Sequence, residues 1–369
     1  MTIVPRSEVV RLVRAEHGGR LPLVTDLPAH AREGLLDFST TVHAYGPPPE
    51  VRQALQEACL EEYPDPDASA FCALAAKVGG VPVKWVMAGS GSVEFLRLIP
   101  LSYVRPRDPV LIIGPTFDEY RVGVEVMGGI IHEVRAKPER GFRSDIGAVV
   151  KTIRSVRPRL IFLCNPNNPT GHYLSEAEVC EILRACGQGI VVMDEAFINF
   201  VAKPWASTRL LQAGPVILVR SMTKDYALPG VRLGYALGDP MLLDPLRKVQ
   251  VPWSVSSLAQ AAGIAAFSEK DYLPKVMRVV REDARVFVEE LRAEGLGVVH
   301  EAAHFCLISV ADGDEAAESL CRFGMLVRSC RSFGLKAYIR VGPRRPEENA
   351  RLIQAMRTAH SYQPSAFSE

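Results

Sequence analysis

The sequence predicts an α/β protein with a large, mostly parallel sheet flanked by helices and a second, smaller α+β domain. Between about residues 80 and 235, short runs rich in β-branched residues alternate with stretches of helical period, as in βαβ units around a parallel sheet. After Pro252 the pattern changes to long helical stretches and a few short strand candidates. A chain of 369 residues also exceeds the usual size of a single core, so two domains are expected.

The expected elements follow from the positions of these runs. Short apolar runs rich in β-branched residues fit strands that are buried on both faces. The expected strands of the large sheet include Val83 to Met87, Val110 to Ile113, Leu160 to Cys164, Ile190 to Met193 and Val216 to Val219. The smaller domain is expected to contain helices at Ser257 to Phe267 and Tyr272 to Glu294, and strands around Phe305 to Val310 and Ala337 to Val341.

Composition excludes several classes of protein. Lys and Arg total 43 and Asp and Glu total 42, a balance that gives no broad attraction to nucleic acid or to an anionic membrane. No segment is long and apolar enough to span a bilayer, and the first 20 residues lack the apolar core of a secretory signal. The eight cysteines contain no C-x-x-C pair, so no metal or redox motif is indicated, and a cytoplasmic protein with reduced cysteines is expected.

Lys224 follows the last expected strand of the large sheet. Two hydroxyl side chains, Ser221 and Thr223, precede it, and Arg232 lies eight positions beyond it. A lysine in this setting can form an imine with an aldehyde while its neighbours bind a phosphate. Considered alone, Lys224 is better explained as a solvated loop lysine, since most lysines lie on the surface.

Two further polar residues follow buried strands. Asn168 lies in the stretch N-P-N-N-P-T-G at 165–171, where its amide can donate a hydrogen bond to a ring hydroxyl. Asn-Pro and Thr-Gly alone predict only turns. Asp194 begins the stretch D-E-A-F at 194–197 and needs a cationic partner, because an unpaired buried carboxylate is costly. A protonated pyridine nitrogen is such a partner.

Residues 89–94, G-S-G-S-V-E, join a strand to a helix and form a candidate phosphate site. Glycines let the backbone approach an anion, and the start of the helix offers unpaired N–H groups. Alone, such a turn is more often a plain helix cap. Phe117, in G-P-T-F at 114–117, can stack on a pyridine ring, although a single phenylalanine usually belongs to a core.

Together, the motifs N-P-N-N-P-T-G, D-E-A-F and S-x-T-K…P-G-x-R-x-G-Y resemble those of the fold-type I pyridoxal-phosphate (PLP) enzymes, in the branch that contains histidinol-phosphate aminotransferase and threonine-phosphate decarboxylase. The likeness runs from about His17 to Met356. It implies an enzyme with a seven-stranded sheet in a large PLP-binding domain, placed at residues 45–255. Residues 1–44 and 256–369 are then expected to form the small domain with an N-terminal arm.

The resemblance also implies roles for these residues. Lys224 would hold PLP as a Schiff base, Asp194 would pair with its pyridine nitrogen, and Asn168 would bond the ring oxygen. Phe117 would stack on the ring. Tyr63 matches a tyrosine that reaches the phosphate of the neighbouring subunit, which implies a homodimer with shared sites. The cofactor phosphate would be bound by Ser92, Val93 (through its backbone), Ser221, Thr223 and Arg232.

Substrate contacts are implied in the same way. Arg340, in Y-I-R-V at 338–341, matches the arginine that clamps the substrate α-carboxylate by a two-pronged bond. Arg328 matches a second arginine, which contacts the distal anion of phosphorylated substrates. Without the resemblance, either arginine would be assigned to the surface. His17 and Gly18, in the early H-G-G, match residues that help to bind substrate in the decarboxylases.

The substrate stays open because several asparagines of the family are replaced here. Asn168 is retained as a candidate substrate contact, but another expected substrate-facing asparagine is Thr41. Three more asparagines are replaced by His43, Ser256 and His304. Unmatched buried polar groups cost about 1–3 kcal/mol each, so these replacements change which substrate groups can be bound.

Three functions are compatible with these residues. A PLP-dependent decarboxylase of a small, anionic or phosphorylated amino acid, resembling L-threonine-O-3-phosphate decarboxylase, is favoured by His17-Gly18-Gly19, by L-D-F-S at 36–39 and by Phe197 in place of a usual Tyr. The alternative is an aminotransferase of the histidinol-phosphate type, which the general motif set favours. The third is a non-catalytic PLP-binding protein, against which the retention of Lys224, Asp194 and Asn168 argues.

Overall fold

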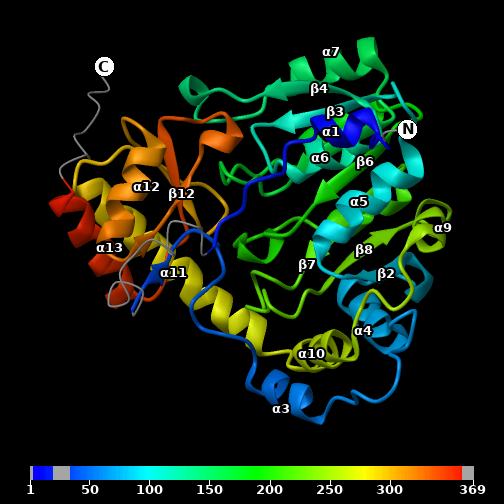
Figure 1. Cartoon of the computed structure of the whole chain (residues 1–369), viewed down its shortest axis with the longest axis horizontal. Coiled ribbons are helices and arrows are strands. Elements are labelled where there is room, and N and C mark those ends of the chain that lie inside the picture. Colours follow the sequence, from blue (N-terminus) through cyan, green and yellow to red (C-terminus); the bar gives the residue numbers. More distant parts are fainter. Residues whose placement is uncertain (1–2, 20–33, 360–369) are drawn as a thin grey trace.

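A seven-stranded sheet forms the centre of the structure (Figure 1). The computed structural model describes residues 3–19 and 34–359. The strands are β2 (Val86–Gly89), β3 (Pro109–Gly114), β4 (Ile130–Arg135), β5 (Leu160–Cys164), β6 (Ile190–Asp194), β7 (Val216–Ser221) and β8 (Gly234–Gly238). Their order is β2-β8-β7-β6-β5-β3-β4, and β8 is antiparallel to both of its neighbours while the other adjacent pairs are parallel. The predicted α/β class with a mostly parallel seven-stranded sheet is confirmed.

Most strands lie where the sequence predicts them. β5 spans the predicted five residues, and all of its side chains are buried, as expected for a strand covered on both faces. The predicted strand at Val83 to Met87 is wrong at its start. Val83–Trp85 form a short 3-10 turn, in which the Trp85 amide donates to the Pro82 carbonyl at 2.9 Å. The fixed φ of Pro82 suits the residue that opens such a turn, and β2 begins only at Val86.

Helices cover both faces of the sheet, because successive residues of a strand point to opposite sides. One face carries α4 (Ser69–Gly79), α7 (Ile146–Val156), α8 (Glu176–Ala185) and α10 (Ser257–Ser268), and the other carries α5 (Ser92–Tyr103), α6 (Glu119–Val126) and α9 (Pro240–Val249). In β5, Ile161 and Leu163 pack with the first group, whereas Leu160 and Phe162 pack with the second. The inner strands β5 and β6 are therefore enclosed, whereas the edge strand β4 has no fully buried residue.

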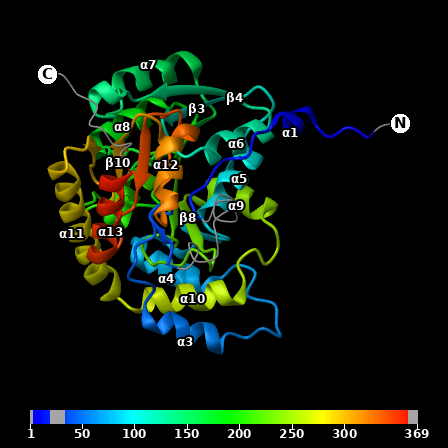
Figure 2. The same ribbon diagram turned by 60° about the vertical axis from the view of Figure 1, so that its left-hand side comes forward.

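The smaller domain lies beside the carboxyl ends of the parallel strands (Figures 1 and 2). Its antiparallel sheet has the order β12-β13-β10-β9, with β9 (Val298–Val299), β10 (Cys306–Ser309), β12 (Arg328–Ser329) and β13 (Tyr338–Val341). The helices packed with it are α11 (Tyr272–Ala293), α12 (Gly313–Arg322) and α13 (Pro346–Thr358). The helix predicted at Tyr272 to Glu294 and the two predicted strands are therefore present, each within two residues of its expected ends.

The N-terminal part of the chain contacts both domains. Near α1 (Ser7–Arg11), the Arg6 guanidinium donates to the carbonyl of Val126, the last residue of α6, at 2.8 Å. Further along, β1 (Leu36–Asp37) pairs in parallel with β11 (Met325–Leu326) of the small domain. Of the residues between them, Glu16, His17 and Gly18 line the cavity where the two domains meet.

The division of the chain at residue 256 stays a prediction. The side chains of Ala259, Ala262 and Ala266 in α10 are buried in the apolar cluster around the large sheet. α10 also lies beside α3 (Pro49–Glu57), as Figure 1 shows. Packing therefore groups α10 with the large domain, although the predicted boundary assigns it to the small one.

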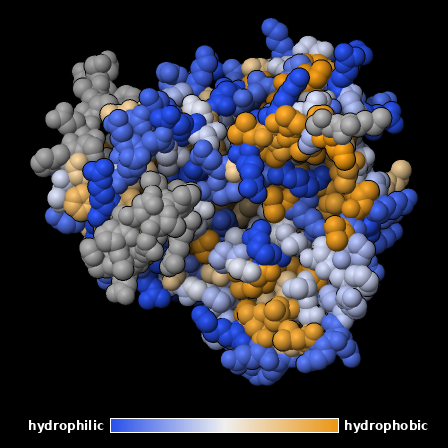
Figure 3. Space-filling view, viewed as in Figure 1, coloured by the Kyte–Doolittle hydropathy of each residue, from blue (hydrophilic) through white to orange (hydrophobic). Residues whose placement is uncertain are grey.

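Apolar residues also reach the surface of the large domain. Figure 3 shows them in two groups on this face, one low, in the region where Figure 1 places α3 and α10, and one at the upper right, in the region of α1, α5 and α6. In residues 3–19 and 34–359, no helix is both long and apolar enough to cross a membrane, and no group of His, Cys, Asp and Glu side chains could hold a metal ion. All eight cysteines are free, and six of them are buried; the cytoplasmic location stays a prediction.

Candidate active site

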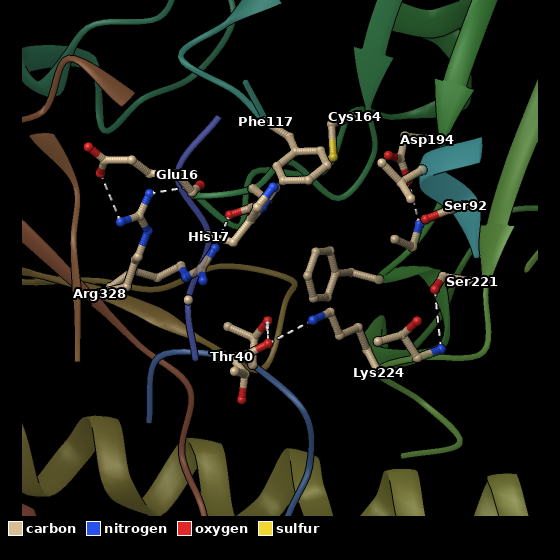
Figure 4. Close-up of a pocket in the computed structure, with 18 of the residues that line it drawn as sticks. Glu16, His17, Thr40, Ser92, Phe117, Cys164, Asp194, Ser221, Lys224 and Arg328 are labelled. Atoms are coloured by element: carbon tan, nitrogen blue, oxygen red, sulfur yellow. Dashed lines mark hydrogen bonds and ion pairs between the residues drawn. The ribbon is translucent and has the colours of Figure 1, made fainter. Parts of the chain in front are cut away.

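A cavity of about 300 Å³ lies where the two domains meet. Its lining comes from the carboxyl ends of β5 and β6, the loop after β7, the amino end of α5, the small-domain sheet and the N-terminal segment (Figure 4). Ligands of open α/β sheets bind at this edge of the sheet. Every residue that the sequence and the resemblance assign to the cofactor or the substrate borders this cavity, with the exception of Tyr63.

Lys224 points into the cavity from the loop after β7 (Figure 4). Its Nζ donates to the carbonyl oxygen of Thr40 at 2.8 Å. Burial, with the nearby positive charges of Arg340 and Arg232, lowers the pKa of Lys224 to about 7. A neutral amine is the nucleophilic form of lysine, so near neutral pH this side chain can attack a carbonyl carbon.

Asp194 ends β6 and is only 4% exposed. Its carboxylate accepts hydrogen bonds from the Tyr120 hydroxyl and the Ala196 amide, both at 2.9 Å. Burial raises the pKa of Asp194 to about 6, because the charged form loses its hydration. Among the described residues no cationic side chain forms an ion pair with it, so a ligand with a protonated ring nitrogen would supply the missing partner.

The amino end of α5 forms one end of the cavity and fits a phosphate group. Ser92 and Val93 open this helix, after Gly91 with a φ of +75°. A Cβ atom at Gly91 would lie 2.7 Å from Nη2 of Arg232, so a side chain there would push that guanidinium out of its present place. Helix N-termini attract anions through unpaired N–H groups and the helix dipole. The buried Ser221 and Thr223 face the same end of the cavity.

The middle of the cavity can hold a flat ring. Phe117 forms one wall, and Cys164 lies beside Asp194 because the two residues are paired in the register of β5 and β6. Asn168 is buried and accepts a hydrogen bond from Arg340 through its amide oxygen, so its amide nitrogen remains the donor end. The amine, the buried acid and the anion site thus fit the aldehyde, the ring nitrogen and the phosphate of PLP.

Arg340 reaches the cavity from β13 of the small domain. One of its terminal nitrogens donates to the Ser39 carbonyl at 2.7 Å and the other to Asn168. Its guanidinium carbon lies 5.5 Å from the centre of the Phe305 ring. Nε of Arg340 has no hydrogen-bond partner in the described part of the chain. A buried guanidinium with an unpaired N–H can receive a carboxylate.

Arg328 lies on the opposite side of the cavity from Asp194 and Ser92 (Figure 4). It is 3% exposed and forms an ion pair with Glu16 at 3.2 Å. Glu16 precedes His17 and Gly18, whose role the resemblance implies, but the sequence gives no sign that it would reach this arginine 312 residues away.

His17 connects the N-terminal segment to the large domain. Its Nε2 lies 2.8 Å from a carboxylate oxygen of Glu119, which also binds Arg97. Burial alone would raise the pKa of Glu119, but the hydrogen bond with His17 and the charge of Arg97 lower it. A Cβ atom at Gly18 would lie 2.4 Å from the carbonyl oxygen of Ser39. The segment can therefore follow this path only with a glycine there.

The four residues that stand where the family has asparagines lie in different surroundings. Thr41 borders the cavity, with a φ of +56°. His43 is buried against the loop that carries Lys224, where its Nε2 lies 3.0 Å from the Asp225 carbonyl and its Nδ1 accepts from the Tyr45 amide. Burial lowers the pKa of His43 to about 4, so it is neutral. His304 stacks on Phe200 with ring centres 3.8 Å apart, and Ser256 caps the start of α10.

Tyr63 is the one predicted site residue outside the cavity of its own chain. Its side chain is 79% exposed and stacks on Trp253, with ring centres 4.5 Å apart. An exposed tyrosine outside the cavity of its own chain is compatible with the expected contact to a neighbouring subunit, which stays a prediction.

Comparison with known proteins identifies the family. Residues 33–356 match the model of the family described as aminotransferase class I and II. The chain belongs to this family. This aminotransferase-family enzyme is 34% identical over 330 residues to the histidinol-phosphate aminotransferase of Symbiobacterium thermophilum, in an alignment that covers 88% of the chain and 90% of the relative.

Solved structures of the aminotransferase family and its neighbours share the fold. Histidinol-phosphate aminotransferase from Sinorhizobium meliloti, in complex with pyridoxal-5'-phosphate, aligns with a TM-score of 0.80 at 22% identity, covering 92% of this chain and 96% of that one. L-threonine-O-3-phosphate decarboxylase from Porphyromonas gingivalis aligns with a TM-score of 0.77 at 24% identity, covering 88% and 99%. The predicted resemblance to fold-type I enzymes is confirmed.

Proposed function

We propose that this aminotransferase-family enzyme binds PLP through Lys224 and transfers an amino group between a 2-oxo acid and an amino compound with a distal phosphate or similar anion. The single observation that carries this proposal is the pairing of one cavity, which contains Lys224, Asp194 and two buried arginines, with a relative named histidinol-phosphate aminotransferase at 34% identity. The decarboxylase expectation is less well supported, because the threonine-phosphate decarboxylase is a neighbour in fold alone.

Each of these residues of the cavity would have a different role in such a reaction. When bound, PLP supplies an electron sink for a carbanion at the substrate Cα. Asp194 would stabilise the positive charge of the ring nitrogen, and the residues at the start of α5 would bind the phosphate. Lys224 would hold the cofactor covalently, and its amine would carry the proton to and from Cα, a role worth about 10²–10⁴-fold in rate. Arg340 binds the carboxylate of the 2-oxo acid or amino acid.

The lowered pKa of Lys224 predicts how the cofactor-free protein recombines with PLP. The rate of covalent attachment should rise between about pH 6 and pH 8, with a midpoint near 7, because the amine becomes neutral there. Stopped-flow absorbance after mixing with PLP measures this rate, and a free lysine derivative serves as the control. A rate that continues to climb above pH 9 would show that burial does not lower this pKa.

The reaction class is tested with the purified holoenzyme. Amino compounds with and without a phosphate are offered with and without a 2-oxo acid, while release of carbon dioxide and amino transfer are both followed. We expect turnover that requires the 2-oxo acid and releases no carbon dioxide. Carbon dioxide release without any 2-oxo acid would show that the enzyme is a decarboxylase and not an aminotransferase.

A decarboxylase of a phosphorylated amino acid is the second candidate. The observation that favours it is the place of the H-G-G stretch, since His17 and Gly18 both border the cavity. Phe197 also borders it, where the aminotransferases of this group usually carry a tyrosine. These contacts would hold a small substrate close to Lys224, and only the assay of the products separates the two reactions.

Arg328 gives a test of the distal anion site. Arg328→Ala should weaken binding of phosphorylated substrates by about 10- to 100-fold, because a buried charge-assisted contact is lost, while neutral substrates change little. The measurement is KM for matched phosphorylated and unphosphorylated donors. Arg331→Ala, three residues further on and exposed, is the matched control. An equal rise in KM for both donors would show that Arg328 does not bind the distal anion.

A homodimer is part of the same proposal. Leu60, Tyr63, Val251 and Trp253 are all exposed apolar residues on the large domain, and clustered apolar surface commonly marks a protein interface. Sedimentation equilibrium of the wild type and of Trp253→Ser tests the dimer. A wild-type protein that stays monomeric at micromolar concentration would contradict it.

A further inference from the structure

Arg328 already binds a carboxylate of its own chain. Nη1 lies 3.2 Å from a carboxylate oxygen of Glu16, while Nη2 donates to the Glu16 carbonyl at 3.0 Å and to the Ser332 hydroxyl at 2.6 Å. The aromatic ring of Phe333 lies under the guanidinium, 5.6 Å from its central carbon. Figure 4 shows this pair at the side of the cavity away from Asp194 and Ser92. An internal anion therefore occupies the place where a distal anion of the substrate is expected.

The Glu16 side chain can leave this place at little cost. It is 64% exposed, although its partner is buried. In the described part of the chain, residues 13–19 form no hydrogen bond between backbone groups. Among the described residues, its polar contacts are instead those with Arg328, the pair His17–Glu119, and the bond from the Gly19 amide to the Ser39 hydroxyl at 2.7 Å. Rotation of one exposed side chain into water leaves the last two intact.

Nη1 of Arg328 cannot bind the Glu16 carboxylate and the distal anion of a substrate at the same time. A phosphate brought to its Nη1 would face the Glu16 carboxylate at close range, and like charges so near to each other repel. The contacts of Nη2 with the Glu16 carbonyl and Ser332 do not involve that carboxylate. They can hold the guanidinium in place while the carboxylate and the phosphate exchange.

We propose that Glu16 is a specificity-determining residue, whose carboxylate occupies the anion site at Arg328 in the substrate-free enzyme and is displaced by the distal group of the substrate. The inference rests on the proposed function, since it assumes a substrate with a distal anion. A phosphate dianion carries enough charge to displace Glu16, whereas a neutral distal group does not. Glu16 thus selects substrates by the charge at their far end.

The test uses the PLP-loaded enzyme, so that the cofactor phosphate fills the site at Ser92, and inorganic phosphate as the probe. Glu16→Gln keeps the size of the side chain and removes its charge. We expect this variant to bind phosphate about tenfold more tightly, measured by thermal shift and by inhibition of turnover with a neutral donor. KM for a phosphorylated donor should fall by a similar factor, and KM for the neutral donor should stay unchanged. Glu181→Gln, an exposed acid on α8, is the control.

A double-mutant cycle tests whether the effect of Glu16→Gln on phosphate binding depends on the ion pair between Glu16 and Arg328. In an Arg328→Ala background, Glu16→Gln should no longer change phosphate binding, because the shared partner is gone. Weaker phosphate binding by Glu16→Gln, unchanged binding, or an equal gain for neutral donors would each overturn the proposal. Transamination that persists in these cases leaves the proposed function intact. If no donor is turned over, the proposed function fails, while the thermal shift by phosphate still decides the role of Glu16.

Discussion

Replacement of Lys224 by alanine should abolish turnover and leave any bound PLP without a covalent link to the protein. The variant loses both the amine that attacks the cofactor and the base that moves the Cα proton. The second loss alone is worth about 10²–10⁴-fold in rate. Borohydride reduction followed by mass spectrometry should find a cofactor adduct on the wild-type peptide that contains Lys224 and none on the variant. Single-turnover kinetics with added substrate measures the loss in rate.

The alanine variant should also remain folded. The pKa of Lys224 falls from 10.5 to about 7 on burial, so between these values the unfolded chain binds more protons than the native one. Stability of the cofactor-free protein therefore rises with pH across this window, and the variant should lose this rise. Lys203→Ala, an exposed lysine, should keep both the adduct and the pH dependence. Near wild-type turnover by the Lys224→Ala variant would contradict the proposed mechanism.

The strands and the residues at their ends could be predicted because the causes are local. β5 and β6 are continuous apolar runs followed by polar residues, and the carboxyl ends of neighbouring parallel strands meet at one edge. This brings Asn168 and Asp194 together whatever the rest of the chain does. β8 was not predicted, because Gly234–Gly238 is a short run that gains its strand character from pairing with β2 and β7.

The parts of the site that could not be predicted depend on contacts between distant segments. Tyr120 lies on α6 and reaches Asp194, 74 residues away. Glu16 reaches Arg328 across 312 residues, and neither periodicity nor a motif marks such a pair. An exposed acid before H-G-G looks like any solvated residue until the small domain brings its partner to the cavity. The proposed specificity contact thus depends on a tertiary contact, whereas the residues proposed to bind the cofactor lie in sequence motifs.

Asp194→Asn should have opposite effects on the stability of the cofactor-free protein and on the activity of the holoenzyme. Burial raises the pKa of Asp194 from 3.8 to about 6, so between these values the native state binds more protons than the unfolded chain. The free energy of unfolding therefore falls as pH rises through this window. Above pH 6 the buried charge costs up to about 3 kcal/mol. The asparagine removes this cost and can still bond both Tyr120 and the Ala196 amide.

The same substitution should lower kcat by about 10²-fold or more, since the ring nitrogen loses the charge that keeps it protonated as electrons arrive. Urea denaturation of the cofactor-free proteins at pH 5 and pH 8 measures the stability, and the gain should be larger at pH 8. Tyr120→Phe is the matched control, because it removes one hydrogen bond to Asp194 and keeps the acid. A variant that is more stable but fully active would mean that Asp194 is merely a strained core residue. A variant that loses activity without the pH-dependent gain would mean that the carboxylate already has a partner in the cofactor-free protein. Only the combination of both effects identifies an acid that the fold buries at a cost in stability and the cofactor then uses.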